Sequence, residues 1–64
     1  MTTLIRLPAV LARTGLSRSR LYELLGRKEF PRPVKLSPNG RTVVWSDAEV
    51  ANWIEARLAE REVA

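Results

Sequence analysis

The segment Thr14-Gly15-Leu16-Ser17 constrains this chain most, because it predicts a tight turn between two helices. Glycine readily adopts the positive φ that ends a helix, and serine is a favoured residue for capping the start of the next helix. The leucine between them can close the turn against an apolar core. The segment therefore predicts two helices that meet at an angle, as in a helix-turn-helix.

Apolar residues on both sides of the turn recur at the three- and four-residue steps of an amphipathic helix. Before the turn, Pro8 suits a first helical position, and we expect a helix from Pro8 to Arg13 or Thr14. After the turn, we expect a helix from Arg18 to about Lys28, with Leu21, Leu24 and Leu25 on its buried side. Pro31 and Pro33 then require an extended connector.

A β-hairpin is predicted after the connector. Val34-Lys35-Leu36 alternates apolar and polar residues, Ser37-Pro38-Asn39-Gly40 contains a favoured turn pair, and Val43-Val44-Trp45 resumes strand character. If Val34, Leu36, Val43 and Trp45 face inward, Lys35 faces outward and Arg41 projects near the tip. The pattern leaves a shift of one residue in this register open.

A third helix is predicted to begin at Ser46-Asp47-Ala48-Glu49, which fits a capping box. Its apolar stripe includes Val50, Trp53, Ile54 and Leu58, and we expect both tryptophans in the core. The predicted fold class is mainly α with a small β-hairpin, a winged helix-turn-helix of three helices and a two-stranded wing. We expect one domain over residues 1–64, with fraying at residues 1–4 and 60–64.

The composition argues against an enzyme. The 64 residues contain no cysteine and no histidine, so thiolate chemistry and zinc sites built on these ligands are excluded. The seven carboxylates form no convincing catalytic pair, and the three glycines lie in separate elements rather than in a phosphate-binding loop. We therefore expect no catalytic activity, no cofactor, no metal and no small-molecule ligand.

The net charge of +4 is typical of a domain that contacts phosphate groups. Nine of the eleven cations are arginine, which suits contact with phosphate and guanine, although a GC-rich coding sequence would raise arginine equally well. No apolar run approaches the roughly 20 residues of a membrane span, and no signal peptide is apparent. We expect a cytoplasmic, nucleoid-associated protein that has no membrane partner.

The side of the second helix opposite its leucines is polar, basic and aromatic. In a helix-turn-helix the N-terminal residues of this helix reach base edges, and a wing can contact an adjacent groove or its phosphates. A solvated charged face is the alternative for the helix taken alone. The candidate DNA-binding residues are Ser17, Arg18, Ser19, Arg20, Tyr22, Glu23, Arg27, Lys28, Lys35 and Arg41.

These candidates have different expected roles. Ser17 caps the helix, Arg18, Ser19, Arg20 and Tyr22 contact bases and phosphates, Arg27 and Lys28 contact the backbone, and Arg41 lies in the wing. Glu23 lies in the middle of the proposed contact face. It could accept a hydrogen bond from a cytosine amino group or repel phosphate, and the residues leave both possibilities open.

Two segments resemble a known family. The stretch from Thr14 to Tyr22 and the stretch Phe30-Pro31-Arg32-Pro33-Val34-Lys35-Leu36, followed by Trp45 and Trp53, are similar to the AlpA family of phage-type regulators. The resemblance covers roughly Leu4 to Leu58. It implies a relation to excisionase and MerR-type winged-helix domains, with recognition-helix residues from Arg18 to Arg27 and a wing from Ser37 to Arg41. Arg20 departs from the small or polar residues common there, which affects the base preference.

The resemblance implies a sequence-specific double-stranded DNA-binding protein that regulates transcription in a prophage or integrated element. An excisionase that bends DNA beside an attachment site is one alternative, with an integrase or self-association on DNA as possible partners. A protein-interaction module with a basic face is another. Neither an operator sequence nor an oligomeric state follows from the residues.

Overall fold

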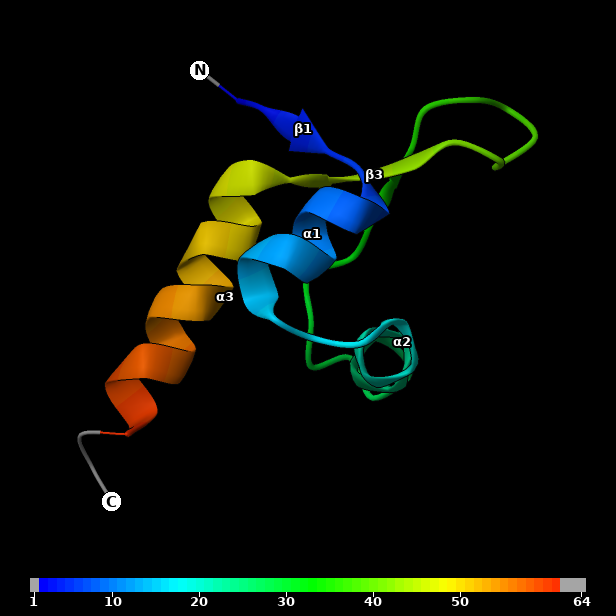
Figure 1. Cartoon of the computed structure of the whole chain (residues 1–64). Helices are drawn as coiled ribbons and strands as arrows, with labels where there is room; N and C mark the ends of the chain where they lie inside the picture. The colour runs from blue at the N-terminus through cyan, green and yellow to red at the C-terminus, as the bar shows by residue number, and fades with distance from the viewer. Residues whose placement is uncertain (1, 62–64) are drawn as a thin grey trace.

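A computed structural model describes residues 2–61 of the chain. The elements follow the order β1 (Leu4–Ile5), α1 (Leu7–Thr14), α2 (Arg18–Gly26), β2 (Val34–Lys35), β3 (Val43–Ser46) and α3 (Asp47–Glu60). Figure 1 shows the helices on one side of the strands, with the loop between β2 and β3 projecting away from the helices. This arrangement confirms the mainly helical fold with a helix-turn-helix and a hairpin. Within residues 2–61, no helix has the length and apolar character needed to cross a membrane.

The turn between α1 and α2 has the predicted capping. Gly15 adopts a φ of 76°, and its N–H donates to the carbonyl oxygen of Leu11 at 2.8 Å. The hydroxyl of Ser17 accepts from the backbone N–H of Arg20 at 3.1 Å. The hydroxyl of Thr14 donates to the carbonyl oxygen of Val10 at 2.8 Å. These hydrogen bonds satisfy backbone groups that the two helix ends would otherwise leave unpaired.

The second helix ends earlier than predicted. Instead of reaching Lys28, α2 ends at Gly26, and Lys28 adopts a left-handed φ of 62°. The N–H of Lys28 donates to the carbonyl of Leu25 at 3.0 Å, and the N–H of Glu29 donates to that of Leu24 at 2.8 Å. This pair of hydrogen bonds is a Schellman motif, which closes a helix without requiring the usual glycine.

The three strands form one antiparallel sheet in the order β1-β3-β2, one strand more than predicted. Leu4 pairs with Ser46 and Ile5 with Trp45, and the N–H of Asp47 donates to the carbonyl of Thr3 at 2.8 Å. Residues 3–5 are therefore paired where we expected fraying up to residue 4. A strand of two residues is too short to show an alternation of apolar and polar residues. Its pairing with another strand could therefore not be predicted from the local sequence. Residues 1 and 62–64 of the expected frayed ends lie outside the described residues, and residue 60 is helical.

The hairpin register corrects the predicted facing of its residues. Val34 pairs with Val44 and Lys35 with Val43, and paired residues share a face of the sheet. Lys35 therefore lies on the same face as Val43, while Val34 and Leu36 are 45% and 56% exposed rather than inward. A shift of one residue moves every side chain of a strand to the other face, which is why the prediction for Val34, Lys35 and Leu36 was wrong.

The core lies between the helices and the sheet. Trp45 is fully buried, and its ring N–H donates to the carbonyl of Pro31 at 3.0 Å. Trp53 packs edge-on against Phe30 with 4.9 Å between ring centroids, and its ring N–H donates to the carbonyl of Glu29 at 2.8 Å. Both tryptophans are thus part of the core or packed against it, as predicted.

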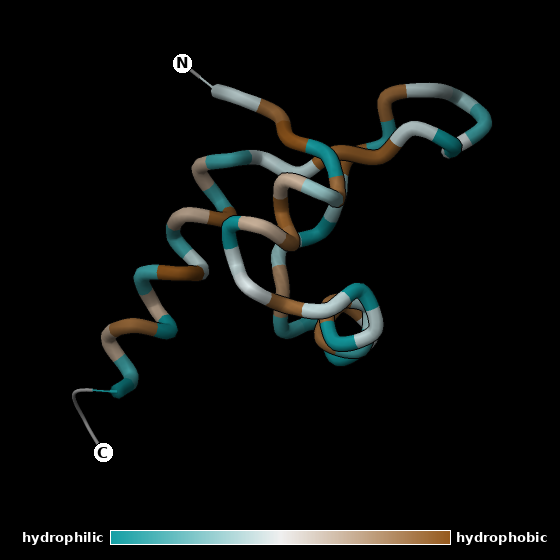
Figure 2. Tube along the Cα trace, viewed as in Figure 1, coloured by the Kyte–Doolittle hydropathy of each residue, from teal (hydrophilic) through white to brown (hydrophobic). Residues whose placement is uncertain are grey.

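Leu58, at 42% exposed, extends the apolar stripe of α3 beyond the core. Figure 2 shows apolar residues along β1 and β3 and a polar hairpin tip.

Candidate nucleic-acid interface

The outward side of α2 is the first part of the candidate interface. Leu21 and Leu24 are buried, so the opposite side of this helix faces solvent. Tyr22 is 48% exposed, and it borders a shallow hollow with Ser19. This hollow is lined by Ser17, Ser19, Arg20, Tyr22 and Glu23. Five of the ten predicted residues therefore lie together on one surface, which we call the contact face.

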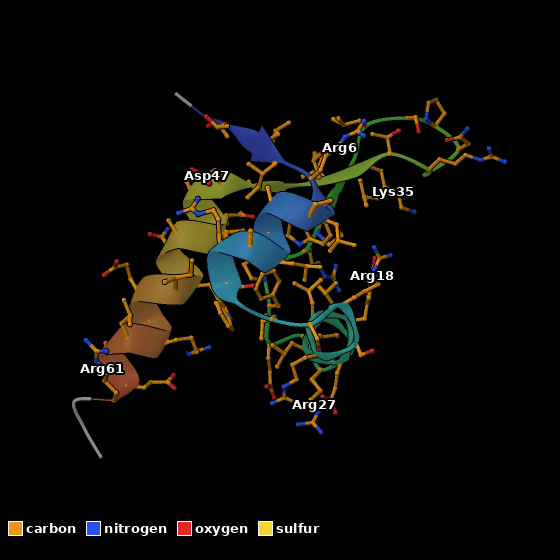
Figure 3. All side chains as sticks on the ribbon, viewed as in Figure 1. Arg6, Arg18, Arg27, Lys35, Asp47 and Arg61 are labelled. Atoms are coloured by element: carbon orange, nitrogen blue, oxygen red, sulfur yellow. The ribbon has the colours of Figure 1, made fainter. Side chains whose placement is uncertain are left out.

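One edge of the contact face meets the hairpin. Arg18 lines a cleft of about 270 Å³ that also reaches the start of α1 and the end of the hairpin loop. The residues that line this cleft are Arg6, Leu7, Pro8, Arg18, Arg41, Thr42 and Val43. In Figure 3, Arg6 and Lys35 lie beside the hairpin, and Arg18 lies between the hairpin and α2. The structure thus places Arg18 and Arg41 in the lining of the same cleft.

The other edge of the contact face is partly neutralised. Glu23 forms an ion pair with Arg20, and its second carboxylate oxygen lies 3.6 Å from a guanidinium nitrogen of Arg27. The hydrogen bond from Arg20, together with its charge, lowers the pKa of the Glu23 carboxyl, and Arg27 adds a smaller effect. Glu23 therefore holds two arginines along the surface of the helix, a role that neither predicted alternative included.

The remaining predicted residues are spread around this surface. The aliphatic stem of Lys35 lies beside the turn at Gly40, so that a Cβ placed there would be 3.5 Å from its Cδ. The turn is closed by the N–H of Gly40 on the carbonyl of Ser37 at 3.0 Å, and Asn39 Oδ1 accepts from the N–H of Arg41 at 3.0 Å. Lys28 lies beyond the C-terminal end of α2 and lines neither the hollow nor the cleft.

Arg6 is the site residue that the sequence analysis missed. It occupies the N-cap position of α1, yet its side chain makes no capping hydrogen bond. Ser, Thr, Asp or Asn is favoured at that position, so an arginine there was a usable signal. The chain offers no comparable candidate for a metal: among residues 2–61, no group of three or more metal-ligating side chains lies together.

A comparison with known protein families shows to which family this chain belongs. The family model described as "Prophage CP4-57 regulatory protein (AlpA)" matches residues 3–58, which run from the residue before β1 almost to the end of α3. The chain belongs to the AlpA family. The match includes the contact face of α2, the hairpin and Arg6, so the whole candidate interface lies inside the AlpA region.

Two curated proteins are similar to this AlpA-family chain. The uncharacterised protein ORF88 of Enterobacteria phage P4 is 43% identical over 58 residues, which cover 91% of this chain and 64% of that protein. The DNA-binding transcriptional activator AlpA of Escherichia coli strain K12 is 36% identical over 59 residues, covering 84% of this chain and 83% of that protein. The chain therefore spans less than two thirds of the phage P4 protein. No solved structure matches this chain.

Proposed function

We propose that this AlpA-family chain binds double-stranded DNA with sequence preference and regulates transcription in a prophage or other integrated element. The observation that carries the proposal is the contact face of α2: a capped helix whose outward side is exposed and polar, beside a hairpin on the same side of the molecule. An α-helix presented in this way fits a major groove about 12 Å wide.

The proposed docking gives each part of the interface a different task. α2 enters the major groove with its N-terminal residues toward the base edges, where Arg18, Ser19 and Tyr22 are exposed. Arg41 and Lys35 in the hairpin contact the backbone or an adjacent groove. Arg20 contributes to this surface when DNA competes for its guanidinium with Glu23.

The regulatory part of the proposal is supported by the relatives. The Escherichia coli protein carries the name of a DNA-binding transcriptional activator, and the aligned region covers 83% of its length. The family itself is described as that of a prophage regulatory protein. That kinship, together with the contact face of α2, supports a transcriptional role for this chain.

A binding selection tests the proposal directly. The purified chain is used to select sequences from a random duplex pool, and fluorescence anisotropy then compares the selected duplex with a scrambled one over a series of salt concentrations. We expect preference for the selected duplex and a steep fall of affinity with salt, because phosphate contacts release counterions. Failure to bind any duplex even at low salt would refute DNA binding and favour a protein-interaction module.

Footprinting of the locus distinguishes the two kinds of DNA-binding protein. A single protected operator over a promoter is expected for a transcriptional regulator. Several tandem protected sites beside an attachment site, with bending of the DNA, would instead indicate an excisionase that acts with an integrase.

A further inference from the structure

Three arginines from three different elements line the cleft between the hairpin and the helix starts. Arg6 precedes α1, Arg18 begins α2, and Arg41 follows the hairpin turn, and all three are exposed. The other residues that line the cleft are Leu7, Pro8, Thr42 and Val43, so no carboxylate lies among them. Like charges brought together in this way repel one another unless an anion lies between them.

Four of the other six arginines have acidic partners among residues 2–61. Arg13 pairs with Asp47, Arg57 with Glu60, and both Arg20 and Arg27 with Glu23. Among residues 2–61, no such pair involves Arg6, Arg18 or Arg41. The cleft is therefore lined by three arginines that have no acidic partner among the described residues, whereas the opposite edge of α2 is internally compensated.

The N-termini of α1 and α2, which lie beside the cleft, add positive charge to that of the arginines. The first turns of α1 and α2 contain no acidic residue, whereas the first turn of α3, away from the cleft, contains Asp47 and Glu49. The partial positive charge at the N-termini of α1 and α2 thus adds to the three guanidinium groups. The residues that line the cleft and the two helix starts beside it thus favour an anion.

We infer that this cleft binds one phosphate group of the DNA backbone, held by Arg6, Arg18 and Arg41. The inference rests on the proposed function, and it adds Arg6 and a single shared phosphate to it. Guanidinium groups suit a phosphodiester because their planar N–H groups match its oxygens in pairs. The cleft lies beside the N-terminal end of α2, where the strand that borders the major groove passes when such a helix docks.

The test uses the selected duplex with one neutral methylphosphonate placed at each backbone position in turn. For the unmodified chain, one substitution beside the contact face is expected to weaken binding about tenfold, the scale of a charge-assisted contact. Arg6→Gln, Arg18→Gln and Arg41→Gln are each expected to bind the natural duplex more weakly and to become clearly less sensitive to that same methylphosphonate. Each variant should also reduce the salt slope by about 1.

Arg61→Gln is the matched control, because it removes the same charge from the far end of the molecule (Figure 3). It should keep the full sensitivity to the methylphosphonate. Circular dichroism and thermal unfolding of Arg6→Gln check that the fold is intact. The Arg6 side chain makes no capping bond, so its helix should persist. If Arg6→Gln keeps the sensitivity, or the three variants lose sensitivity at different phosphates, the shared site is wrong.

A second arm separates this inference from the proposed function. NMR signals of the arginine side chains are followed in the free chain while inorganic phosphate is added. The signals of Arg6, Arg18 and Arg41 are expected to shift together, and that of Arg61 to stay. If no duplex binds but these three signals shift, the site binds phosphate from another source and only the proposed function fails. If neither duplex nor phosphate affects them, the site itself is refuted.

Discussion

Arg18 and Arg41 line the same cleft, but they extend from elements that meet DNA in different ways. Arg18 belongs to the N-terminal turn of α2, which in this docking faces base edges, whereas Arg41 belongs to the hairpin loop. A contact to a base edge discriminates between sequences, and a contact to phosphate strengthens binding to all of them. Arg41 is therefore expected to contribute to affinity alone, whereas Arg18 is expected to contribute to specificity in addition to its contact with the shared phosphate.

Arg18→Ala is expected to lower the preference for the selected duplex over a scrambled one by about 1 to 3 kcal/mol, the scale of one bidentate base contact. Arg41→Ala is expected to weaken binding to both duplexes by a similar factor and leave their ratio unchanged. Anisotropy titrations with both duplexes measure this, with Arg61→Ala as the charge-matched control. An equal small loss for Arg18→Ala and Arg61→Ala would contradict the role of Arg18 in specificity.

Glu23 should titrate at an unusually low pH for an exposed carboxyl. Its pKa lies below the ordinary value because Arg20 donates a hydrogen bond to it and both Arg20 and Arg27 attract its charge. A depressed folded-state pKa stabilises the fold above the unfolded-state pKa, and this contribution is lost as the pH falls through the folded-state value. Carbon-detected NMR titration of the glutamate carboxyls measures the shift. Arg20→Ala should raise the pKa of Glu23 toward the ordinary value of a glutamate carboxyl, and an unchanged value would contradict the ion pair.

The helix-turn-helix illustrates what the sequence could establish about single elements. Its helices were predictable because the caps are local: Gly15 ends α1 and Ser17 begins α2, each with hydrogen bonds inside its own turn. The end of α2 was less predictable, because a lysine takes the left-handed position that glycine usually occupies. The sheet was least predictable, since the pairing of Ile5 with Trp45 joins segments far apart in the chain.

Two glycines give a matched test of the turn. Gly15 has a φ of 76°, and a Cβ there would meet nothing within 4 Å, so Gly15→Ala isolates the conformational cost. We expect a loss of about 1 to 2 kcal/mol of unfolding free energy, because L-residues disfavour that conformation. Gly26 is also free of close neighbours but helical, and Gly26→Ala should gain up to about 1 kcal/mol. Urea unfolding of both variants measures this, and effects of equal sign would contradict the assignment.

Lys28 offers a test at the other end of α2. Its φ of 62° is strained for any residue with a side chain, so Lys28→Gly is expected to stabilise the fold by about 1 kcal/mol. The same change removes a cation from the end of the helix. If Lys28 contacts the DNA backbone as predicted, thermal stability rises while affinity for all duplexes falls and the salt slope decreases by about 1. Higher stability with unchanged affinity would remove Lys28 from the interface.

Across the whole molecule, two tryptophan rings fix the connector that joins the helices to the sheet. Trp53 donates to the carbonyl of Glu29 and Trp45 to that of Pro31, so the segment after α2 is held on both sides of Phe30. Trp53→Phe is expected to cost about 1 kcal/mol by leaving a carbonyl unpaired, and Trp45→Phe more, because that ring is fully buried. Leu58→Ala, at an exposed position on α3, should change stability by less than about 0.5 kcal/mol. Thermal unfolding compares the three variants, and equal losses would contradict this account.

The candidate site was predictable only for those residues that belong to a single element, because strand pairing is not recorded in the local sequence. Arg18, Ser19 and Tyr22 follow from the helical wheel of one element, so the sequence placed them on one face. Arg6 enters the site only because β1 pairs with β3 and so brings the start of α1 beside the hairpin. Lys35 was assigned to the opposite face because the register of a short hairpin depends on packing that no local pattern records.

The short strand β1 indicates the order in which the parts of this molecule fold. The α1-α2 turn forms from neighbouring residues and can fold early. Strand β1 must instead pair with β3, which lies far along the chain, and closing so long a loop is slow and has an entropic cost. A two-residue edge strand is also the part that opens most easily in the folded state. We expect each such opening to release Arg6 from the cleft while the α1-α2 turn stays formed. The preference for one DNA sequence would then persist while the contact of Arg6 with the DNA backbone breaks and re-forms.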